Sequence, residues 1–325
     1  MFSLRLRMSI LVIILFAILY AIGSLVLYYI GVTGFLPQIL LAAGMIFVQY
    51  LIGPKIVEMS MRVKYIKKEE APWLFEMVES LASRANIKTP KIGISYINVP
   101  NAFAFGRGIK DGRICVTKGI MDLLDKDELK AVIGHEMSHL KNRDVLFITL
   151  LSVIPLLLYR LFWQFTFYGS YSRRREEGGN YAALIGIAAF LFYFITNLLV
   201  LYASRIREYF ADKGSIALGN SPSTMATALY KLVYGAARTP KEDLKQIEGL
   251  KAFFLNDLSR ARKEIADLAE LDLDRSGAID SYELRSLAEK EIKLSFADRA
   301  MELLSTHPNM LKRIRQLSQY SKGQA

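Results

Sequence analysis

The chain of 325 residues is poor in two residue types that often serve at reactive sites, with one cysteine and three histidines. A single cysteine cannot form an internal disulfide bond, which excludes the class of small secreted proteins that disulfides stabilise. Cys115 lies in an apolar, strand-like segment with no histidine near it in the sequence, so we predict a buried side chain and not a nucleophile. Because histidines are so few, their positions are informative.

Charged residues are absent from residues 8–54, although the whole chain carries 42 Lys and Arg against 31 Asp and Glu, a net charge of +11. This uncharged stretch is long enough to cross a hydrocarbon core of about 30 Å twice. Turn-forming residues at 31–37 divide it, so we predict two membrane-spanning helices, Ile10–Ile30 and Leu36–Ile52. A signal peptide is the alternative for the first helix, but its apolar run is too long and no small-residue cleavage site precedes the second.

A second apolar block begins after residue 144. Residues 145–172 carry a single charge, Arg160, and residues 178–204 carry none. We predict a third span at Val145–Phe162, in which Arg160 must snorkel or face protein, and a fourth at Tyr181–Ala203. With 52% apolar residues, the composition fits a multi-pass protein of the cell membrane.

The orientation in the membrane follows from the basic residues near the ends of the spans. Arg5 and Arg7 precede the first span, and five basic residues follow the second: Lys55, Arg62, Lys64, Lys67 and Lys68. Both flanks are therefore predicted to be cytoplasmic, together with residues 55–144. Arg173, Arg174 and Arg175 between spans three and four oppose this orientation, and we give the first hairpin more weight. Basic residues beside spans suit an anionic lipid surface, and no nucleic-acid-binding motif is present.

The polar parts of the chain combine helical and strand patterns. Helical spacing is found in Pro72–Ala85 and Asp127–Asn142, and Lys91–Val99 alternates as a strand does. Asn101–Phe105 and Arg113–Lys118 are predicted to form a hairpin. The fold class is therefore α+β, mainly α, with four transmembrane helices and a small antiparallel sheet.

The sequence His135-Glu-Met-Ser-His139 lies inside the second of these helices. Residues i and i+4 share a helix face, so both imidazoles can bind one Zn²⁺. Glu136 is offset toward the open position of the metal, where its carboxylate can accept a proton from water and pass it to a leaving amine. We predict a catalytic zinc site, the alternative being two surface histidines.

A catalytic zinc needs a third protein ligand, and an acidic pair follows the fourth span. Glu208 and Asp212 are also i, i+4; Glu208 suits the ligand and Asp212 suits an acceptor that orients a ligand imidazole. Spans three and four separate this pair from His139, and two crossings return the chain to the same side of the membrane. We therefore expect one metal to recruit all three ligands.

The third histidine, His307, lies between Thr306 and Pro308, as a residue at the start of a helix does. One interpretation is a helix-capping residue. The other is a donor to the developing oxyanion, assisted by Arg313.

These segments together resemble the HtpX-type membrane zinc metalloproteases, relatives of the prenyl-protein CaaX endoproteases. The likeness is carried by His135–His139, Ala203–Asp212, Asn101–Ala104 and His307–Ile314. It implies a gluzincin-like catalytic domain on the cytoplasmic face that cleaves misfolded membrane proteins, a stress-response role. It also implies Zn²⁺ on His135, His139 and Glu208, with Glu136 as base and with His307 and Arg313 steadying the transition state.

The same resemblance makes Asn101–Phe105 an edge strand. Such a strand can pair with an extended polypeptide substrate through backbone hydrogen bonds, which require little side-chain specificity. The substrate strand would comprise Asn101, Ala102, Phe103 and Ala104, and the alternative is an ordinary edge strand.

A twelve-residue segment of the C-terminal part, residues 272–283, matches the calcium loop of the EF-hand. Gly277 stands at the turn position and Ile279 at the hydrophobic position. The predicted Ca²⁺ ligands are Asp272, Asp274, Ser276, the carbonyl of Ala278, Asp280 and Glu283. A single hand is unusual, and the segment departs from the family pattern, so we hypothesise that Ca²⁺ orders this region and positions His307.

The predicted organisation has six parts: a transmembrane hairpin at 1–54, a catalytic region at 55–144, a second hairpin at 145–204, a helical region with the third ligand at 205–257, the EF-hand-like segment at 258–292 and a closing helical segment at 293–325. The predicted activity is that of a zinc endopeptidase acting on unfolded or membrane proteins. The alternatives are a prenyl-peptide processing protease and a metal-held membrane scaffold or Ca²⁺ sensor without turnover. The sequence does not indicate an oligomeric state.

Overall fold

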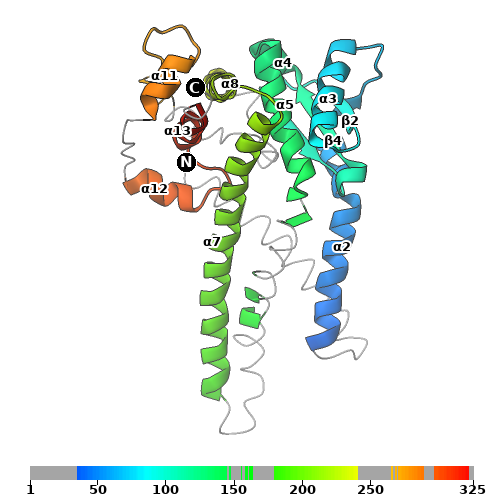
Figure 1. The fold of residues 1–325 in the computed structure, drawn as a ribbon. Coiled ribbons are helices and arrows are strands. Elements are labelled where there is room, and N and C mark those ends of the chain that lie inside the picture. The colour runs from blue at the N-terminus through cyan, green and yellow to red at the C-terminus, as the bar shows by residue number, and fades with distance from the viewer. Residues whose placement is uncertain are drawn as a thin grey trace.

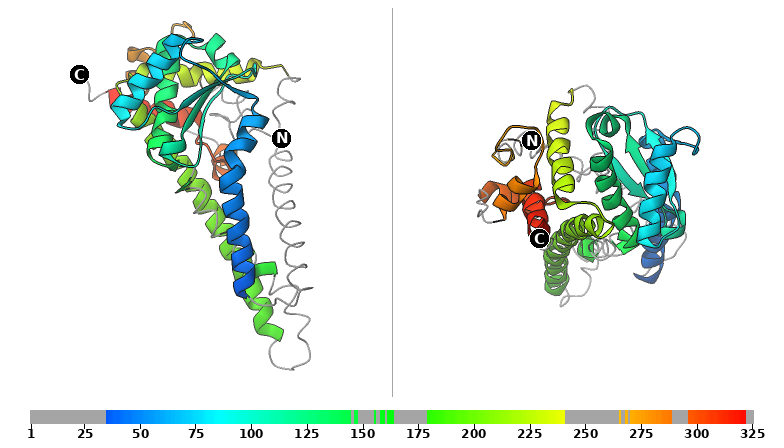
Figure 2. Two further views of the ribbon diagram at one scale, coloured as in Figure 1. Left: turned by 90° about the vertical axis from the view of Figure 1, so that its right-hand side faces the viewer. Right: turned by 45° about the horizontal axis from the view of Figure 1, so that its top comes forward.

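A computed structural model describes residues 35–144, 179–240, 270–288 and 296–321, together with a few residues between 146 and 163 and at 265 and 268. Two long helices extend from one side of a mixed helical and sheet region (Figures 1 and 2). The elements are α2 (Phe35–Ser60), β1 (Val63–Tyr65), α3 (Pro72–Ala85), β2 (Lys91–Ser95), β3 (Ala102–Phe105), a 3₁₀ turn (Ile109–Asp111), β4 (Arg113–Thr117), α4 (Lys118–Leu123), α5 (Lys126–Lys141), α7 (Gly179–Ala217), α8 (Pro222–Arg238), α11 (Ser281–Leu287), α12 (Phe296–Leu303) and α13 (Met310–Ser321).

The four described strands form one sheet in the order β1-β2-β4-β3. The predicted hairpin is confirmed, because β3 and β4 pair antiparallel with Phe103 opposite Cys115. The prediction of an antiparallel sheet is wrong, because β2 and β4 are parallel, with Ile92 opposite Ile114. β3 lies at the outer edge of the sheet, and β4, which follows it in the sequence, lies between β3 and β2. One edge of β3 is thereby left free of a neighbouring strand in the described part of the chain.

Local signals in the sequence account for the helix ends. Asp125 caps α5 by accepting hydrogen bonds from the N–H groups of Asp127 and Glu128, and the Glu128 side chain accepts one from the Asp125 N–H. The helix therefore begins one residue before the predicted Asp127. Ser221 caps α8 by accepting a hydrogen bond from the Thr224 N–H. Pro222 follows it, at a first-turn position where the missing N–H of proline would have no partner within the helix.

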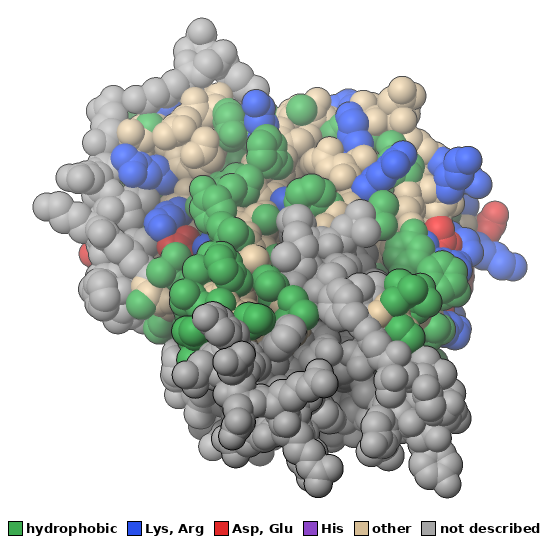
Figure 3. Space-filling model, turned by 90° about the horizontal axis from the view of Figure 1, so that it is seen from below, with side chains coloured by type: hydrophobic (Ala, Val, Ile, Leu, Met, Phe, Trp, Pro, Cys, Tyr) green, Lys and Arg blue, Asp and Glu red, His purple; other side chains and the backbone are tan. Residues whose placement is uncertain are grey.

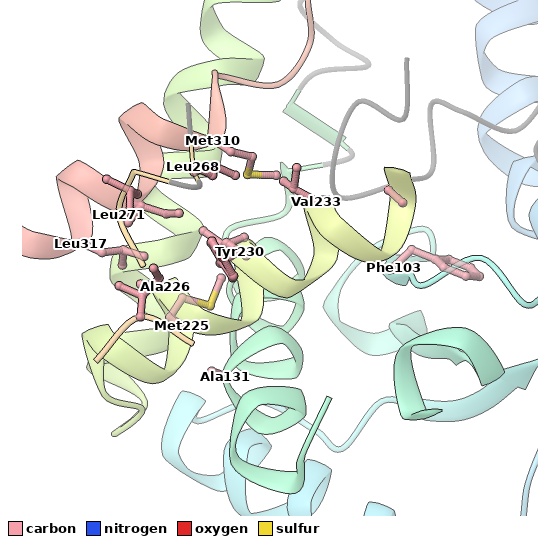
Figure 4. Close-up of a cluster of buried hydrophobic side chains, with 14 of the residues drawn as sticks. Phe103, Ala131, Met225, Ala226, Tyr230, Val233, Leu268, Leu271, Met310 and Leu317 are labelled. Carbon is pink, nitrogen blue, oxygen red and sulfur yellow. The ribbon is translucent and has the colours of Figure 1, made fainter. Parts of the chain in front are cut away.

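Two hydrophobic clusters hold these elements together. One lies between the sheet, α3 and α5 and includes Leu74, Ile114 and Ile133. The other surrounds α8 and joins it to α11 and α13 (Figure 4); its side chains include Tyr230, Leu284 and Leu317. Cys115 is buried in this second cluster, as predicted. The two clusters meet at α5 and α8, so α5 is fixed from both sides.

Helices α5 and α7 cross at very short range because small residues line the contact. A Cβ atom at Gly214 on α7 would lie 2.1 Å from the Oγ of Ser138 on α5. The Ser215 hydroxyl donates to the Ala131 carbonyl at 2.6 Å, and a Cβ at Gly134 would meet the same hydroxyl at 2.9 Å. This crossing brings the side chains of the two helices within reach of a common point.

The two long helices expose apolar side chains over the length that leaves the sheet region. On α7 these include Leu184, Ile187, Leu191 and Leu199, and on α2 they include Leu36, Leu40 and Phe47. Seen from that end, hydrophobic side chains gather beside Lys and Arg side chains (Figure 3). Among the described residues, one helix, Leu184–Ala217, is long and apolar enough to cross a membrane.

The predicted fourth span lies within α7, which continues without a break to Ala217. The predicted second span lies within α2, which continues past Pro54 to Ser60. The first span lies outside the described residues, as does most of the third. Four transmembrane helices therefore remain a prediction.

The helix crossing leads to a first prediction. Gly214→Ala should lower the free energy of unfolding by about 1–3 kcal/mol, because the added methyl group forces α5 and α7 apart. The midpoint of thermal unfolding in detergent should fall accordingly. The zinc content of the purified protein should fall with it. Gly44→Ala on α2 is the matched control, because a Cβ there meets nothing within 4 Å; its midpoint should stay the same or rise. A Gly214→Ala protein with unchanged midpoint and zinc content would contradict this account of the crossing.

Candidate metal centre

The two histidines of α5 face each other across one turn of the helix. Their Nε2 atoms lie 3.0 Å apart, and their rings stand nearly perpendicular, at 83°. His135 is fully buried, and burial lowers the pKa of its imidazole, which favours the neutral form that binds metals.

A carboxylate fixes the tautomer of each imidazole. The Nδ1 atom of His135 lies 2.8 Å from Asp212 Oδ1, and the Nδ1 atom of His139 lies 2.6 Å from Asp144 Oδ2. Ionised carboxylates only accept hydrogen bonds, so the proton of each ring belongs on Nδ1. Both Nε2 lone pairs are then directed into the same small space.

Glu208 completes the arrangement from α7. Its carboxylate oxygens lie 3.7 Å from His135 Nε2 and 3.6 Å from His139 Nε2. Glu208 Oε2 is buried and makes no hydrogen bond of good geometry, although Arg313 Nη1 and His307 Nδ1 lie 3.2 and 3.4 Å from it. Arg313 offsets the charge of the carboxylate, but the two facing Nε2 lone pairs repel it and each other unless a cation lies between them.

The chemistry of these donors fits zinc. Two imidazole nitrogens and one carboxylate form a ligand set of catalytic zinc sites, which keep a fourth position open. Ligand atoms about 2.0–2.1 Å from a tetrahedral ion lie roughly 3.3 Å apart, close to the separations between these three side chains. We therefore expect His135, His139 and Glu208 to hold one zinc ion.

Glu136 lies beside this group. An oxygen of its carboxylate lies within 4.8 Å of ligand nitrogens of both histidines. The side chain is buried and accepts a hydrogen bond from the Ala104 N–H of β3 at 2.7 Å. Burial raises the pKa of Glu136 to about 7, a value suited to a group that both accepts and returns a proton.

Arg313 of α13 contacts the two carboxylates that α7 contributes to this group. It is fully buried, and its guanidinium donates to both oxygens of Asp212, at 2.9 and 2.6 Å. Its Nη1 atom lies 3.2 Å from Glu208 Oε2. These contacts place Arg313 against the two carboxylates of α7, Asp212 and Glu208, and its role beside the oxyanion stays a prediction.

His307 reaches the same group from the turn before α13. Its Nδ1 atom lies 3.4 Å from Glu208 Oε2, and its side chain is 18% exposed. Burial raises the pKa of Glu208, but the opposing effects of His307 and Arg313 hold that pKa well below its usual value. His307 therefore lies next to Glu208 with part of its side chain exposed to solvent.

Sequence reasoning missed two residues, Asp144 and Arg207. Asp144 follows His139 by five residues, and Arg207 of α7 forms an ion pair with it while lying over the Phe147 ring at 4.6 Å. The available signal was that metal-binding histidines almost always donate their second N–H to an acceptor. Each histidine is thus backed by an Asp and an Arg.

The predicted substrate strand lies at the edge of the sheet, next to Glu136. Its N-terminal residue Asn101 is fully buried, and its N–H donates to Thr117 Oγ1 at 2.8 Å. Phe103 packs in the core. Ala102 and Ala104 alternate with these residues, and the Ala104 N–H is directed away from β4, toward Glu136.

The EF-hand-like loop is compact and lies against α8. Carboxylate oxygens of Asp272, Asp274 and Glu283 lie within 4.8 Å of one another. Asp280, at the ninth position, caps α11, whose start at Ser281 matches the exiting helix of the motif. Most of the entering helix lies outside the described residues.

Comparisons with known proteins cover most of the chain. The sequence profile of peptidase family M48 matches residues 68–321. A protease HtpX homolog of Methanothermobacter thermautotrophicus is 50% identical over 231 residues, 71% of this chain and 86% of that protein. Another, of Thermoplasma acidophilum, is 32% identical and covers 97% of both chains. The crystal structure of S. mikatae Ste24p shares the fold with a TM-score of 0.51 at 16% identity, covering 96% of this chain and 67% of that one.

The contact between Asp144 and His139 yields a second prediction. Asp144→Asn should raise the dissociation constant for zinc by about 10–100-fold, because an amide holds the imidazole less firmly in the metal-binding tautomer. The measurement is competition with a chelator of known affinity. Asp122→Asn, the same change at an exposed position of α4, should leave the constant unaltered. Equal affinities in both variants would refute the orienting role of Asp144.

Proposed function

The chain belongs to peptidase family M48, and from this premise we propose that it is an integral membrane zinc endopeptidase with its active site at the cytoplasmic surface. The observation that carries the proposal is the convergence of His135, Glu136 and His139 on α5 with Glu208 on α7. The two helices carry these residues about seventy positions apart in the sequence, yet the Nε2 atoms of His135 and His139 lie within 4 Å of each other and of a Glu208 carboxylate oxygen. Glu136 lies within 4.8 Å of both histidines.

Each residue of the group has a proposed part in peptide hydrolysis. His135, His139 and Glu208 hold zinc, which when bound polarises the scissile carbonyl and acidifies water. Glu136 accepts a proton from the attacking water and donates it to the leaving amine. The pKa near 7 that burial produces leaves both forms of this carboxyl accessible at neutral pH.

His307 is proposed to donate a hydrogen bond to the oxyanion that forms on the carbonyl oxygen. Its partial exposure and its position next to Glu208 support this role. Arg313 is proposed to act indirectly. Its positive charge balances the negative charges of Asp212 and Glu208, so that two carboxylates can be buried close together.

The proposed substrates are unfolded or damaged proteins, membrane proteins among them. The free edge of β3 offers backbone groups beside Glu136, and pairing through the backbone selects for extended chains more than for particular side chains. A protease of this kind would serve in the response to misfolding stress. Multi-pass insertion in the cell membrane, with the site on the cytoplasmic side, is supported by the basic residues that follow α2.

Two alternatives have weaker support. A prenyl-peptide protease needs a lipid-sized cavity between spans, which the predicted number of spans makes small. A scaffold without turnover would not need Glu136 buried against the ligands.

Calcium is proposed to modulate the enzyme through the EF-hand-like loop. The support is the match of residues 272–283 to the motif and the contact of the loop with α8, where Tyr230 donates to Asp272 Oδ2 at 3.0 Å. In proteins with two paired EF-hands, the residue at the position of Ile279 forms hydrogen bonds with the loop of the partner EF-hand. Here the Thr227 hydroxyl of α8 bonds to both the N–H and the carbonyl of Ile279, at 2.9 and 3.0 Å.

The third prediction tests catalysis. Glu136→Gln should fold and retain one zinc, yet hydrolyse casein at least about 100-fold more slowly than the wild type, because an amide cannot accept the proton. Zinc analysis of the same samples separates loss of chemistry from loss of metal. Equal cleavage by the variant and the wild type would disprove the proposed mechanism.

The fourth prediction tests calcium. Added Ca²⁺ should stabilise EDTA-treated, zinc-restored protein by about 2.7 kcal/mol when its concentration is a hundred times the dissociation constant. The midpoint of thermal unfolding should rise accordingly. It should also change the rate of peptide hydrolysis. Asp274→Asn, an exposed change in the loop, should abolish the response, and Asp122→Asn should preserve it. A wild type that responds in neither measurement would eliminate calcium from the proposal.

A further inference from the structure

Arg205 lies on α7 one turn before the proposed ligand Glu208, and its side chain is buried. Its Nη1 atom donates to three carbonyl oxygens at the end of α12, those of Glu302, Leu303 and Ser305, at 2.9, 3.1 and 2.7 Å. The last carbonyls of a helix lack partners within the helix, so a guanidinium is well suited to bind them.

The carbonyls that Arg205 binds begin the loop that carries His307. Residues 304–309 connect α12 to α13. The loop is closed internally, because Glu302 accepts a hydrogen bond from the Asn309 N–H at 3.3 Å and pairs with Lys312, while Ser305 Oγ accepts one from the His307 N–H at 3.3 Å. A closed loop held at its base moves as a unit, so the position of that base determines the position of His307.

One turn of α7 therefore does two things. Residues three apart share a helix face, so Arg205 and Glu208 lie on the same side of α7. Glu208 would hold the metal, and Arg205 holds the loop whose histidine lies 3.4 Å from Glu208. The distance between His307 and the metal ligands is thus set by the spacing of two side chains on a single rigid helix.

We propose that Arg205 is a positioning residue for His307, fixing the His307 loop at a constant distance from the metal ligands. This inference rests on the proposed peptidase function, since it assigns a role in that chemistry. Lys cannot replace Arg205 fully, because its shorter side chain holds the ammonium nearer to the α7 backbone than the Nη1 atom that binds the three carbonyls.

The remainder of the site is anchored independently of Arg205. Helix α13 is held by the Arg313–Asp212 ion pair and by the buried side chains Met310, Ile314 and Leu317. The metal ligands are held by the α5–α7 crossing. Loss of Arg205 should therefore release the His307 loop without unfolding the protein or removing zinc.

The test is a double-mutant cycle in the full-length, zinc-loaded protein, with Arg205→Gln, His307→Ala and the double variant. Arg205→Gln should lower kcat by about 10–100-fold with a smaller change in KM, because misplacement of an active-site group acts mainly on the transition state. Arg205→Lys should recover part of the loss. The double variant should be no slower than His307→Ala alone, and Lys213→Ala, an exposed change on α7, should match the wild type.

Hydrogen exchange provides a readout that does not depend on catalysis. The amides of residues 304–307 should exchange at least about tenfold faster in Arg205→Gln than in the wild type, while those of α13 should not change. A wild type without peptidase activity would defeat the proposed function and leave this exchange result to decide the anchoring of the loop. Unchanged exchange, loss of zinc in Arg205→Gln, or multiplicative effects in the cycle would each overturn the inference.

Discussion

The site depends on the short contact between α5 and α7. Glycine and serine at this crossing let the two backbones approach until a single extra methyl group would clash. All the polar chemistry follows from that approach, because His135 and His139 come from one helix, whereas Glu208 and Asp212 come from the other. Neither helix holds a complete set of ligands, so the site exists only in the folded molecule.

The ionisable groups around this contact form two successive pairings, first of histidine with aspartate and then of aspartate with arginine. Each imidazole is hydrogen-bonded to an aspartate, and each aspartate is paired with an arginine, Arg313 for Asp212 and Arg207 for Asp144. Burial raises the pKa of Asp212, but its ion pair with Arg313 holds that pKa below its usual value. The aspartates occupy the Nδ1 side of each ring and leave the two Nε2 atoms facing each other.

Much of this arrangement could be predicted from the sequence, and the limits have physical causes. The i, i+4 spacing of His135 and His139, and that of Glu208 and Asp212, is a local feature of the sequence. It therefore predicted directly that each pair shares one face of its helix. The hairpin of β3 and β4 was also local. The parallel pairing of β2 with β4 was missed, because it depends on which edge the hairpin takes and not on alternation within either strand.

The contacts of Arg313 could not be read from the sequence for a similar reason. Its position near His307 suggested a shared task, and both side chains do reach Glu208 Oε2, but the ion pair of Arg313 with Asp212 depends on how α13 packs against α7. Asp144 escaped notice because it lies beyond the end of α5, where helical spacing no longer predicts the direction of a side chain. The unbroken course of α7 from its apolar half to Ala217 has a mechanical consequence. The exposed apolar half and Glu208 belong to one continuous helix, so a change in the tilt of that half would also shift Glu208 against α5.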